Sequence, residues 1–208
     1  IRDIVNYSTN DIDARFNWWG EATTAEMETG ENPKNIASIY DYFDYSQRGE
    51  VVYAGWLSEI GGDAPSTIAT RGSILLTDAD GNEQFSFPSG SSVHVYVEDA
   101  DQNTDANTAE SVTASLASDT ETTGETITLN ETGVSTGVFT GSIQLSEGAV
   151  VQGDGILQAS SGDNLTGSYV DPSDDYGNEL TVTDHAYYDV TVVSGVLSSN
   201  TTWSISDS

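Results

Sequence analysis

The chain has 208 residues and carries 34 Asp and Glu against 5 Lys and Arg, which gives a formal net charge of −29. This charge excludes nucleic acid as a partner, because phosphate binding needs cationic side chains on the protein. It also predicts self-repulsion in the compact state, which bound divalent cations would relieve. The chain has no cysteine, so disulfides and thiolate metal sites are excluded.

The composition indicates a folded, strand-rich protein. The hydrophobic fraction is 36%, and 20 glycines are spread through short alternating apolar patterns, which is typical of many strands joined by tight turns. No apolar run is long enough to span a bilayer, and the chain starts at Ile1 without a signal peptide. We therefore expect an excised or processed piece of a secreted protein, located outside the cell or on the cell surface.

Residues 1–58 are predicted to form a capping segment that contains one short helix. Asn32 is the expected N-cap of this helix, and Pro33 occupies its first turn. The expected apolar face and the glycine after the helix end are Ile36, Ile39, Tyr40, Phe43 and Gly49.

The tetrapeptide NWWG at residues 17–20, followed by residues 33–57, resembles the closing coil of right-handed parallel β-helix domains in extracellular proteins. The resemblance implies that Trp18, Trp19 and the short helix cover the open end of a stacked core, where strand edges would otherwise be exposed. Core packing is the favoured role of the two rings, because bulky aromatic side chains are usually buried. The alternative is that they stack on sugars.

Residues 59–71 are rich in Gly, Pro, Ser and Thr and are predicted to be a linker. The main domain follows at residues 72–194. Its predicted strands are Ser73 to Thr77, Ser92 to Glu98, Ser111 to Ala117, Glu125 to Asn130, Gly137 to Leu145, Gly155 to Ala159, Leu165 to Val170, Glu179 to Thr183 and Ala186 to Val193. About seven to nine short strands with regular turns and no helical period predict an all-β fold, an antiparallel β-sandwich.

A β-hairpin at residues 124–145 is the clearest element of this domain. Apolar residues alternate with polar ones on both strands, and Gly133 and Gly137 are expected to supply positive φ in the turn. Glu131 lies at the strand end, where its carboxylate accepts loop amides or faces a cation. The pattern LxETGxxTGxFTGxI resembles a motif of immunoglobulin-like β-sandwich modules in large bacterial and archaeal surface proteins, including S-layer proteins. The resemblance covers residues 70–194 and implies an Ig-like fold.

One loop has the ligand spacing of a calcium site. Oxygen-bearing side chains stand at positions 1, 3, 5, 7, 9 and 12 of the segment from Asp99 to Glu110, and Ca²⁺ prefers six to eight hard oxygen ligands. The candidate ligands are Asp99, Asp101, Asn103, Asp105 and Glu110. Thr104 stands where an EF-hand loop has Gly, and strands flank the segment instead of helices. A solvated acidic turn is the alternative to calcium.

Two further acidic clusters are candidate Ca²⁺ sites. The first consists of Asp78, Asp80 and Asn82, although Asp-Gly between strands also forms a hairpin turn without any metal. The second consists of Asp171, Asp174 and Asp175, whose density predicts repulsion unless a cation lies among them.

The sequence gives little support for catalysis, and a glycoside hydrolase with a pair of carboxylates among the 34 acids is the remaining enzymatic alternative. His94 alternates with valines on a predicted strand, and His185 is predicted in a turn. Neither histidine belongs to a nucleophile–base constellation, and two separate histidines do not make a zinc site. We therefore expect that the chain is not an enzyme.

The C-terminal tail, residues 195–208, resembles the entry strand that precedes a parallel β-helix. The segment from Thr191 to Ser206 carries no charge and no proline, so we expect its backbone to pair with a neighbouring copy or with the next domain of a longer chain. Head-to-tail strand addition of this kind produces a filament by default.

Two functions are consistent with these patterns. The first is a calcium-stabilised structural module of a cell-surface layer, stalk or self-assembling filament. The second is a carbohydrate-binding or adhesive accessory module of a β-helix polysaccharide-acting protein, with glycans bound on a platform of tryptophans. The candidate platform residues are Trp18, Trp19, Trp56 and Trp203.

Overall fold

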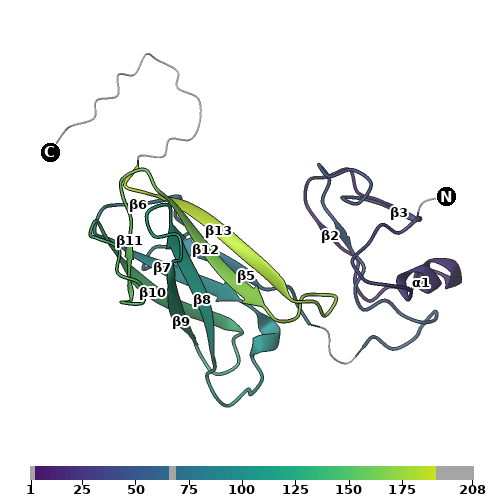
Figure 1. The fold of residues 1–208 in the computed structure, drawn as a ribbon. Helices are drawn as coiled ribbons and strands as arrows, with labels where there is room; N and C mark the ends of the chain where they lie inside the picture. The colour runs from purple at the N-terminus through teal and green to yellow at the C-terminus, as the bar shows by residue number, and fades with distance from the viewer. Residues whose placement is uncertain (1–2, 66–68, 191–208) are drawn as a thin grey trace.

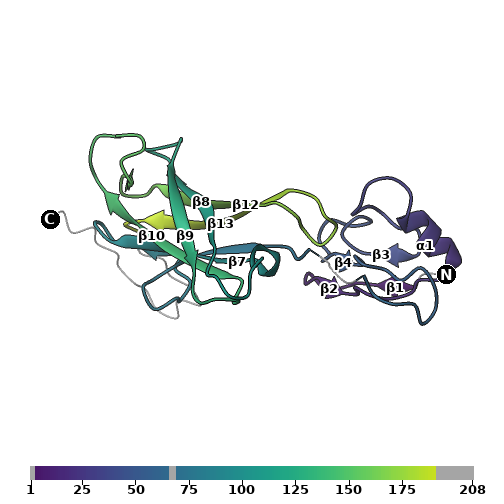
Figure 2. The ribbon, with the colours of Figure 1, turned by 90° about the horizontal axis from the view of Figure 1, so that it is seen from below.

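The computed structural model describes residues 3–65 and 69–190. They form an N-terminal lobe, residues 3–58, and a sheet domain, residues 72–190, which residues 59–71 connect (Figure 1). Figure 2 shows the two lobes end to end along the long axis of the molecule, with the loop after β12 reaching toward the N-terminal lobe. The predicted tail at residues 195–208, with Trp203, lies outside the described residues.

The N-terminal lobe is built from two stacked turns of chain. Its elements are β1 (Ile4–Val5), β2 (Ile12–Asp13), α1 (Glu21–Met27), β3 (Ile39–Tyr40) and β4 (Val51–Val52). β1 pairs with β3 and β2 pairs with β4, both in parallel. The stacking continues past the strands, because Ala14 N donates to Val52 O at 2.9 Å. Parallel pairing between segments about 35 residues apart requires a crossover, which the intervening residues supply.

The helix predicted after Asn32 is wrong. The segment that follows Asn32 forms turns and β3, and the helix of this lobe is α1, earlier in the chain. The Asn32 amide donates to Met27 O at 2.8 Å, so this residue closes the end of α1 and does not begin a helix. Ile36 and Ile39, both 2% exposed, have helical spacing but lie at the two ends of one tight turn, in which Ile39 N donates to Ile36 O at 2.9 Å, and this turn leads into β3.

The core of the N-terminal lobe contains six buried residues: Ala14, Met27, Ile36, Ile39, Val51 and Tyr53. Trp19 is partly buried against this core, in agreement with the packing role expected for it, and Trp56 packs against the same core. Trp18 differs, because 38% of its surface is exposed. The prediction of core packing therefore holds for one of the two adjacent tryptophans only.

The sheet domain contains one curled, mixed sheet of nine strands. In the order of hydrogen bonding the strands are β5 (Ser73–Thr77), β7 (Ser92–Glu98), β10 (Val138–Ser146), β9 (Glu125–Glu131), β8 (Ser111–Ser118), β12 (Asn164–Asp171), β13 (Leu180–Tyr188) and β6 (Ser86–Phe87), with β11 (Ile156–Gln158) added beside β10. The pairs β10–β11 and β13–β6 are parallel, and the other pairs are antiparallel. The predicted all-β class is confirmed.

The sheet curls because its first strand packs against its far end. β5 contacts β12 and β13, and Leu76 N donates to the Asp184 carboxylate at 2.7 Å. At Gly167 on β12 an added Cβ would lie 2.7 Å from Leu76 Cδ2, so a larger residue there would displace the Leu76 side chain, and the close approach of the two layers favours glycine. The enclosed core is apolar and includes Leu76, Phe139 and Tyr188.

Most strand predictions agree with the structure, and the differences occur in polar stretches. The two strands predicted at residues 179–183 and 186–193 are a single strand, β13, as far as the described residues extend. His185, predicted in a turn, lies exposed within β13. Asp184 and His185 have the composition of a turn, but continuous pairing with β12 satisfies their backbone.

The β9–β10 hairpin is confirmed, with Phe139 opposite Glu131. Gly137 has φ +63°, and an added Cβ there would lie 2.8 Å from Ala100 Cα. The expectation of positive φ at Gly133 is wrong, since Ser135 has φ +86° in this turn instead. The turn thus has its two positive-φ residues at Ser135, midway between the predicted glycines, and at Gly137.

Candidate metal centre

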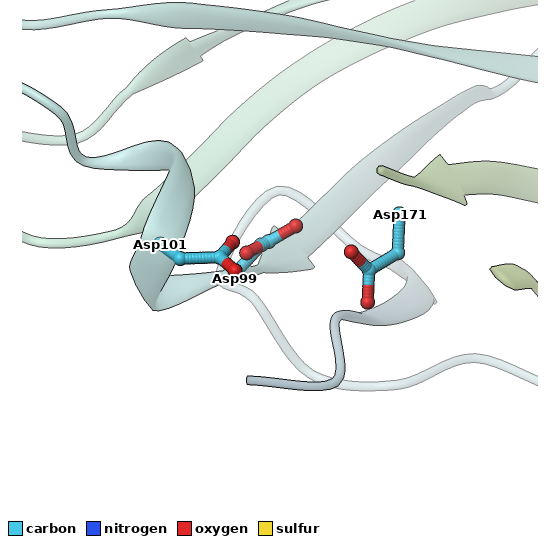
Figure 3. Close-up of side chains that lie close together, drawn as sticks. All are labelled: Asp99, Asp101 and Asp171. Atoms are coloured by element: carbon cyan, nitrogen blue, oxygen red, sulfur yellow. The ribbon is translucent and has the colours of Figure 1, made fainter. Parts of the chain in front are cut away.

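Three carboxylates from separate parts of the sheet domain meet at the end that faces the N-terminal lobe. Asp99 follows β7, Asp101 lies in the 3₁₀ turn Ala100–Gln102, and Asp171 is the last residue of β12. One oxygen from each lies within 4.8 Å of the others. Figure 3 shows the three side chains turned toward one another. β7 and β12 are not neighbours in the sheet, so its curl brings these residues together.

Hydrogen bonds hold the buried Asp171 in a fixed orientation. This residue is fully buried, and its Oδ2 accepts from Gly72 N at 2.7 Å, while its Oδ1 accepts from Ser173 N at 2.8 Å. Both oxygens therefore have backbone donors. Because each carboxylate oxygen carries more than one lone pair, they retain capacity for a cation.

Asp99 is the least satisfied member of the cluster. It is 1% exposed, and its Oδ2 accepts from the Tyr169 hydroxyl at 2.7 Å. Its Oδ1 is buried and has no hydrogen-bond partner within the described part of the chain. Asp101 is only partly buried and accepts from Thr70 N at 3.4 Å and from Gln102 Nε2 at 3.1 Å. An unpaired buried carboxylate oxygen is unfavourable, so this oxygen calls for a proton or a cation.

The electrostatics of the cluster agree with that requirement. Burial raises the pKa of Asp99 to about 7, the adjacent carboxyl of Asp101 and the charge of Asp171 act in the same direction, and the Tyr169 hydrogen bond opposes them. Burial and the neighbouring Asp99 also raise the pKa of Tyr169, so its hydroxyl remains a donor. Near neutral pH a proton is thus held weakly on Asp99, and a cation would displace it.

The donor set favours a hard cation. The three side chains offer carboxylate oxygens, the ligands typical of Ca²⁺, Mg²⁺ and Mn²⁺, whereas zinc sites use His and Cys. This is the one group of three or more acidic, His or Cys ligands that the described residues bring together. Two of its members come from the predicted loop at residues 99–110 and the third from the predicted cluster at residues 171–175.

The other candidates in the loop at residues 99–110 bind neighbouring loop groups or Ser135, although Asn103 Oδ1 and Glu110 Oε2 are buried without a hydrogen-bond partner in the described part of the chain. Glu110 Oε1 accepts from Asp105 N at 2.6 Å and from Thr104 Oγ1 at 3.0 Å, while the Asp105 carboxylate accepts from Asn107 N at 3.0 Å. Asn103 donates to Ser135 Oγ at 3.1 Å. The twelve-residue spacing therefore does not bring Asn103, Asp105 and Glu110 into the Asp99 cluster.

Asp78, Asp80 and Asn82 form a hairpin turn next to β5. Asp78 Oδ1 accepts from the backbone N of Asp80 and of Asn82, both at 2.9 Å, and the flanking residues Thr77 and Glu83 form an antiparallel bridge. The backbone hydrogen bond from Asn82 lowers the pKa of Asp78. These contacts give the hairpin turn that the sequence also allowed.

Glu131 accepts the amides of its own hairpin loop. Its Oε1 receives Thr136 N at 2.6 Å and Gly137 N at 2.8 Å, and its Oε2 receives Glu110 N at 3.2 Å. Burial alone would raise its pKa, but the amides of Gly137, Thr136 and Glu110 bring the pKa down to about 2. Of the two roles predicted for this carboxylate, the structure displays amide binding.

Asp174 and Asp175 lie near Asp171 in sequence but have other roles. Asp174 Oδ1 accepts from the backbone N of Tyr176 and of Asn178, both at 2.9 Å, and so closes the turn after β12. Asp175 pairs with Arg15 of the N-terminal lobe at 2.9 Å. These two residues therefore connect loop and lobe, whereas Asp171 belongs to the cluster.

Sequence reasoning missed another group of buried carboxylates, the pair Glu121 and Glu125. They are 1% and 3% exposed and accept backbone hydrogen bonds from Gln158 N at 2.8 Å and Gly153 N at 2.5 Å. Burial raises the pKa of Glu121, and its contact with Glu125 adds to the shift. The burial of Glu125 was predictable from the sequence, because its side chain lies on the same face of β9 as the inward-facing Ile127.

Comparison of the chain with protein-family models and with curated proteins finds no match. In the described part of the chain, no helix has the length and hydropathy needed to cross a membrane. The functional argument therefore depends on the site itself.

Proposed function

We propose that this chain is a structural module of a cell-surface layer, stalk or extracellular filament, in which Ca²⁺ bound by Asp99, Asp101 and Asp171 stabilises an Ig-like β-sandwich. The observation that carries the proposal is the buried Asp99 Oδ1, which has no partner among the described residues and belongs to a cluster of three carboxylates. The net charge of −29 supports it, because a divalent cation offsets local repulsion.

Calcium is the preferred ion because the ligand set is irregular. Asp101 is partly exposed and comes from a short 3₁₀ turn, so the ligand set tolerates the variable geometry that Ca²⁺ accepts and Mg²⁺ does not. A few carboxylates with water completing the shell are typical of extracellular modules that bind Ca²⁺ with dissociation constants of about 10⁻⁴–10⁻³ M. Such an affinity suits a structural protein located outside the cell.

Calorimetric titration of the full chain tests this function. We expect Ca²⁺ to bind, Asp99→Asn to abolish or strongly weaken binding, and Asp80→Asn to leave it unchanged. Asp80 is the matched control, because it is an exposed acid in a turn outside the cluster. Absence of Ca²⁺ binding, or equal binding by all three proteins, would show that the cluster is not a calcium site.

A second candidate function is glycan binding by the N-terminal lobe. A hollow of about 500 Å³ is lined by Trp18 and Trp19 together with the polar Asp3 and Asn17. An exposed indole beside polar groups is a platform on which sugars stack. A glycan array with the full chain and with Trp18→Ala tests this function. Specific binding that the variant loses supports it, and absence of specific binding excludes it for the glycans tested.

Self-association by strand addition completes the structural proposal. The uncharged segment from Thr191 to Ser206 would be the added strand, with another copy or a neighbouring domain as its acceptor. β1 and β2 each pair with a single strand among the described residues, so the second edge of these strands is the candidate acceptor. Electron microscopy of the chain in Ca²⁺ tests whether ordered polymers form.

A further inference from the structure

The end of the segment that connects the two lobes lies directly on the carboxylate cluster. Thr70 N donates to Asp101 Oδ2 at 3.4 Å, and two residues later Gly72 N donates to Asp171 Oδ2 at 2.7 Å. At Gly72 an added Cβ would lie 3.2 Å from Asp99 Oδ2, so the backbone passes close to the third carboxylate as well. The covalent connection between the lobes therefore enters the sheet domain through the cluster.

Thr70 has an unused oxygen at this place. Its Oγ1 is buried and has no hydrogen-bond partner in the described part of the chain. Its main-chain N is at the same time in contact with Asp101, a member of the cluster. A hydroxyl is a neutral hard-oxygen donor of the kind that hard cations accept alongside carboxylates. A cation in the cluster would satisfy both unpartnered oxygens, Thr70 Oγ1 and Asp99 Oδ1.

The non-covalent connection between the lobes starts from the same cluster. The loop that follows Asp171 reaches the N-terminal lobe through Asp175, which pairs with Arg15 at 2.9 Å. Next to it, the Tyr176 hydroxyl accepts from Tyr53 N at 3.1 Å. The Tyr176 ring also packs edge-on against the Tyr53 ring at 5.2 Å between centroids. The contact is therefore both polar and apolar.

Resting on the calcium function proposed above, we propose that Thr70 is a further ligand of the cation and that the bound cation fixes the N-terminal lobe on the sheet domain. The cation draws Asp101 and Thr70 toward Asp171 and so orders both connections at once. Without it, the carboxylates repel one another, and the partly exposed Asp101 moves away together with its contact to Thr70. Because coupling between two equilibria is reciprocal, contact between the lobes in turn strengthens cation binding.

Two variants of Thr70 in the full chain separate the hydroxyl from the shape of the side chain. Thr70→Val keeps the shape and removes Oγ1, whereas Thr70→Ser keeps the hydroxyl. In calorimetric titration with Ca²⁺ we expect an approximately tenfold weaker affinity for Thr70→Val and an affinity within about twofold of the parent for Thr70→Ser. Equal affinities of the parent and Thr70→Val would overturn the assignment of Thr70 as a ligand.

The orientation of the lobes is measured by electron–electron double resonance between two spin labels. The chain has no native cysteine, so labels are introduced by Ser46→Cys and Thr128→Cys, both at exposed positions, one in each lobe. We expect a narrow distance distribution in Ca²⁺ and a broad one in chelator. Tyr176→Phe, which removes only the hydroxyl between the lobes, is expected to weaken Ca²⁺ affinity severalfold.

The outcomes separate this inference from the calcium function on which it rests. Calcium binding that leaves the distance distribution unchanged overturns the lobe coupling while the calcium site stands. Absence of calcium binding overturns both proposals. A distribution that narrows with Ca²⁺ in the parent and in Thr70→Ser, but not in Thr70→Val at the same Ca²⁺ concentration, supports the inference.

Discussion

Replacement of Asp99 by Asn should have opposite effects on stability with and without calcium. The substitution keeps the size of the buried side chain and an acceptor for the Tyr169 hydroxyl, but it removes the negative charge. In chelator at pH 8 the variant should therefore be more stable than the parent. In calcium the parent should gain stability and the variant should not, because it lacks the anionic ligand.

The size of the stability difference in chelator follows from the pKa of Asp99. Burial, and after it the neighbouring Asp101, raise this pKa from 3.8 to about 7. A carboxyl whose pKa is raised by folding does not change the free energy of unfolding below pH 3.8, where it is protonated in both the folded and the unfolded state. It destabilises the fold progressively as the pH rises toward 7, and the full penalty applies above that. At about 1.4 kcal/mol per pKa unit the penalty is on the order of a few kcal/mol at pH 8.

The stability that the parent gains in calcium follows from mass action. At about one hundred times the dissociation constant, a ligand that binds only the folded state adds about 2.7 kcal/mol. For a chain of this size, 1 kcal/mol corresponds to a shift of about 2–4 °C in Tm, so calcium should raise the Tm of the parent by about 5–10 °C.

Differential scanning calorimetry at pH 8 measures both effects. Parent, Asp99→Asn and the control Asp80→Asn are compared in calcium and in chelator at equal ionic strength, because salt alone screens the charge of −29. If the parent and Asp99→Asn respond equally to calcium, or if Asp99→Asn is less stable than the parent in chelator, the electrostatic reasoning is refuted.

Four further predictions concern other parts of the chain. Glu131→Gln should destabilise the protein at pH 7 in urea titration, and the parent should lose the same contribution as the pH falls from 4.5 to about 2; equal stability at pH 7 would contradict the role of the loop amides. Gly137→Val should cost more than about 1 kcal/mol, because its side chain meets Ala100 and φ is positive; unchanged stability would refute this. Glu121→Gln should raise Tm at pH 8 by removing the repulsion within a buried pair of carboxylates, and a lower Tm would contradict it. Deletion of residues 195–208 should abolish polymer formation in calcium, whereas light scattering equal to that of the full chain would disprove strand addition.

The strands of the sheet domain were predictable because their signal is local. A short apolar run between polar residues predicted β5, and alternation of apolar and polar residues with a period of two predicted β7, both with their observed bounds. In the N-terminal lobe the same kind of reasoning gave a wrong helix, since Ile36 and Ile39 have helical spacing but lie at the two ends of a single turn that leads into β3. The observed helix, α1, has a single large apolar residue, Met27, and therefore carries no clear periodic pattern.

The site was only partly predictable, because it is assembled by the curl of the sheet. Asp99 and Asp101 were candidates through the calcium-like spacing of their loop, yet Asp171, far away in sequence, completes the cluster in place of Glu110. Nothing in the local pattern near Thr70 indicates a ligand. Its position depends on how the connecting segment meets the carboxylates, which is a tertiary property.

A crystal structure of the full chain grown in calcium, with anomalous diffraction collected at long wavelength, tests the central claim most directly. We predict an anomalous peak between the carboxylates of Asp99, Asp101 and Asp171, within about 2.3–2.6 Å of their oxygens. A map without a peak at this position, in crystals saturated with calcium, would contradict the account.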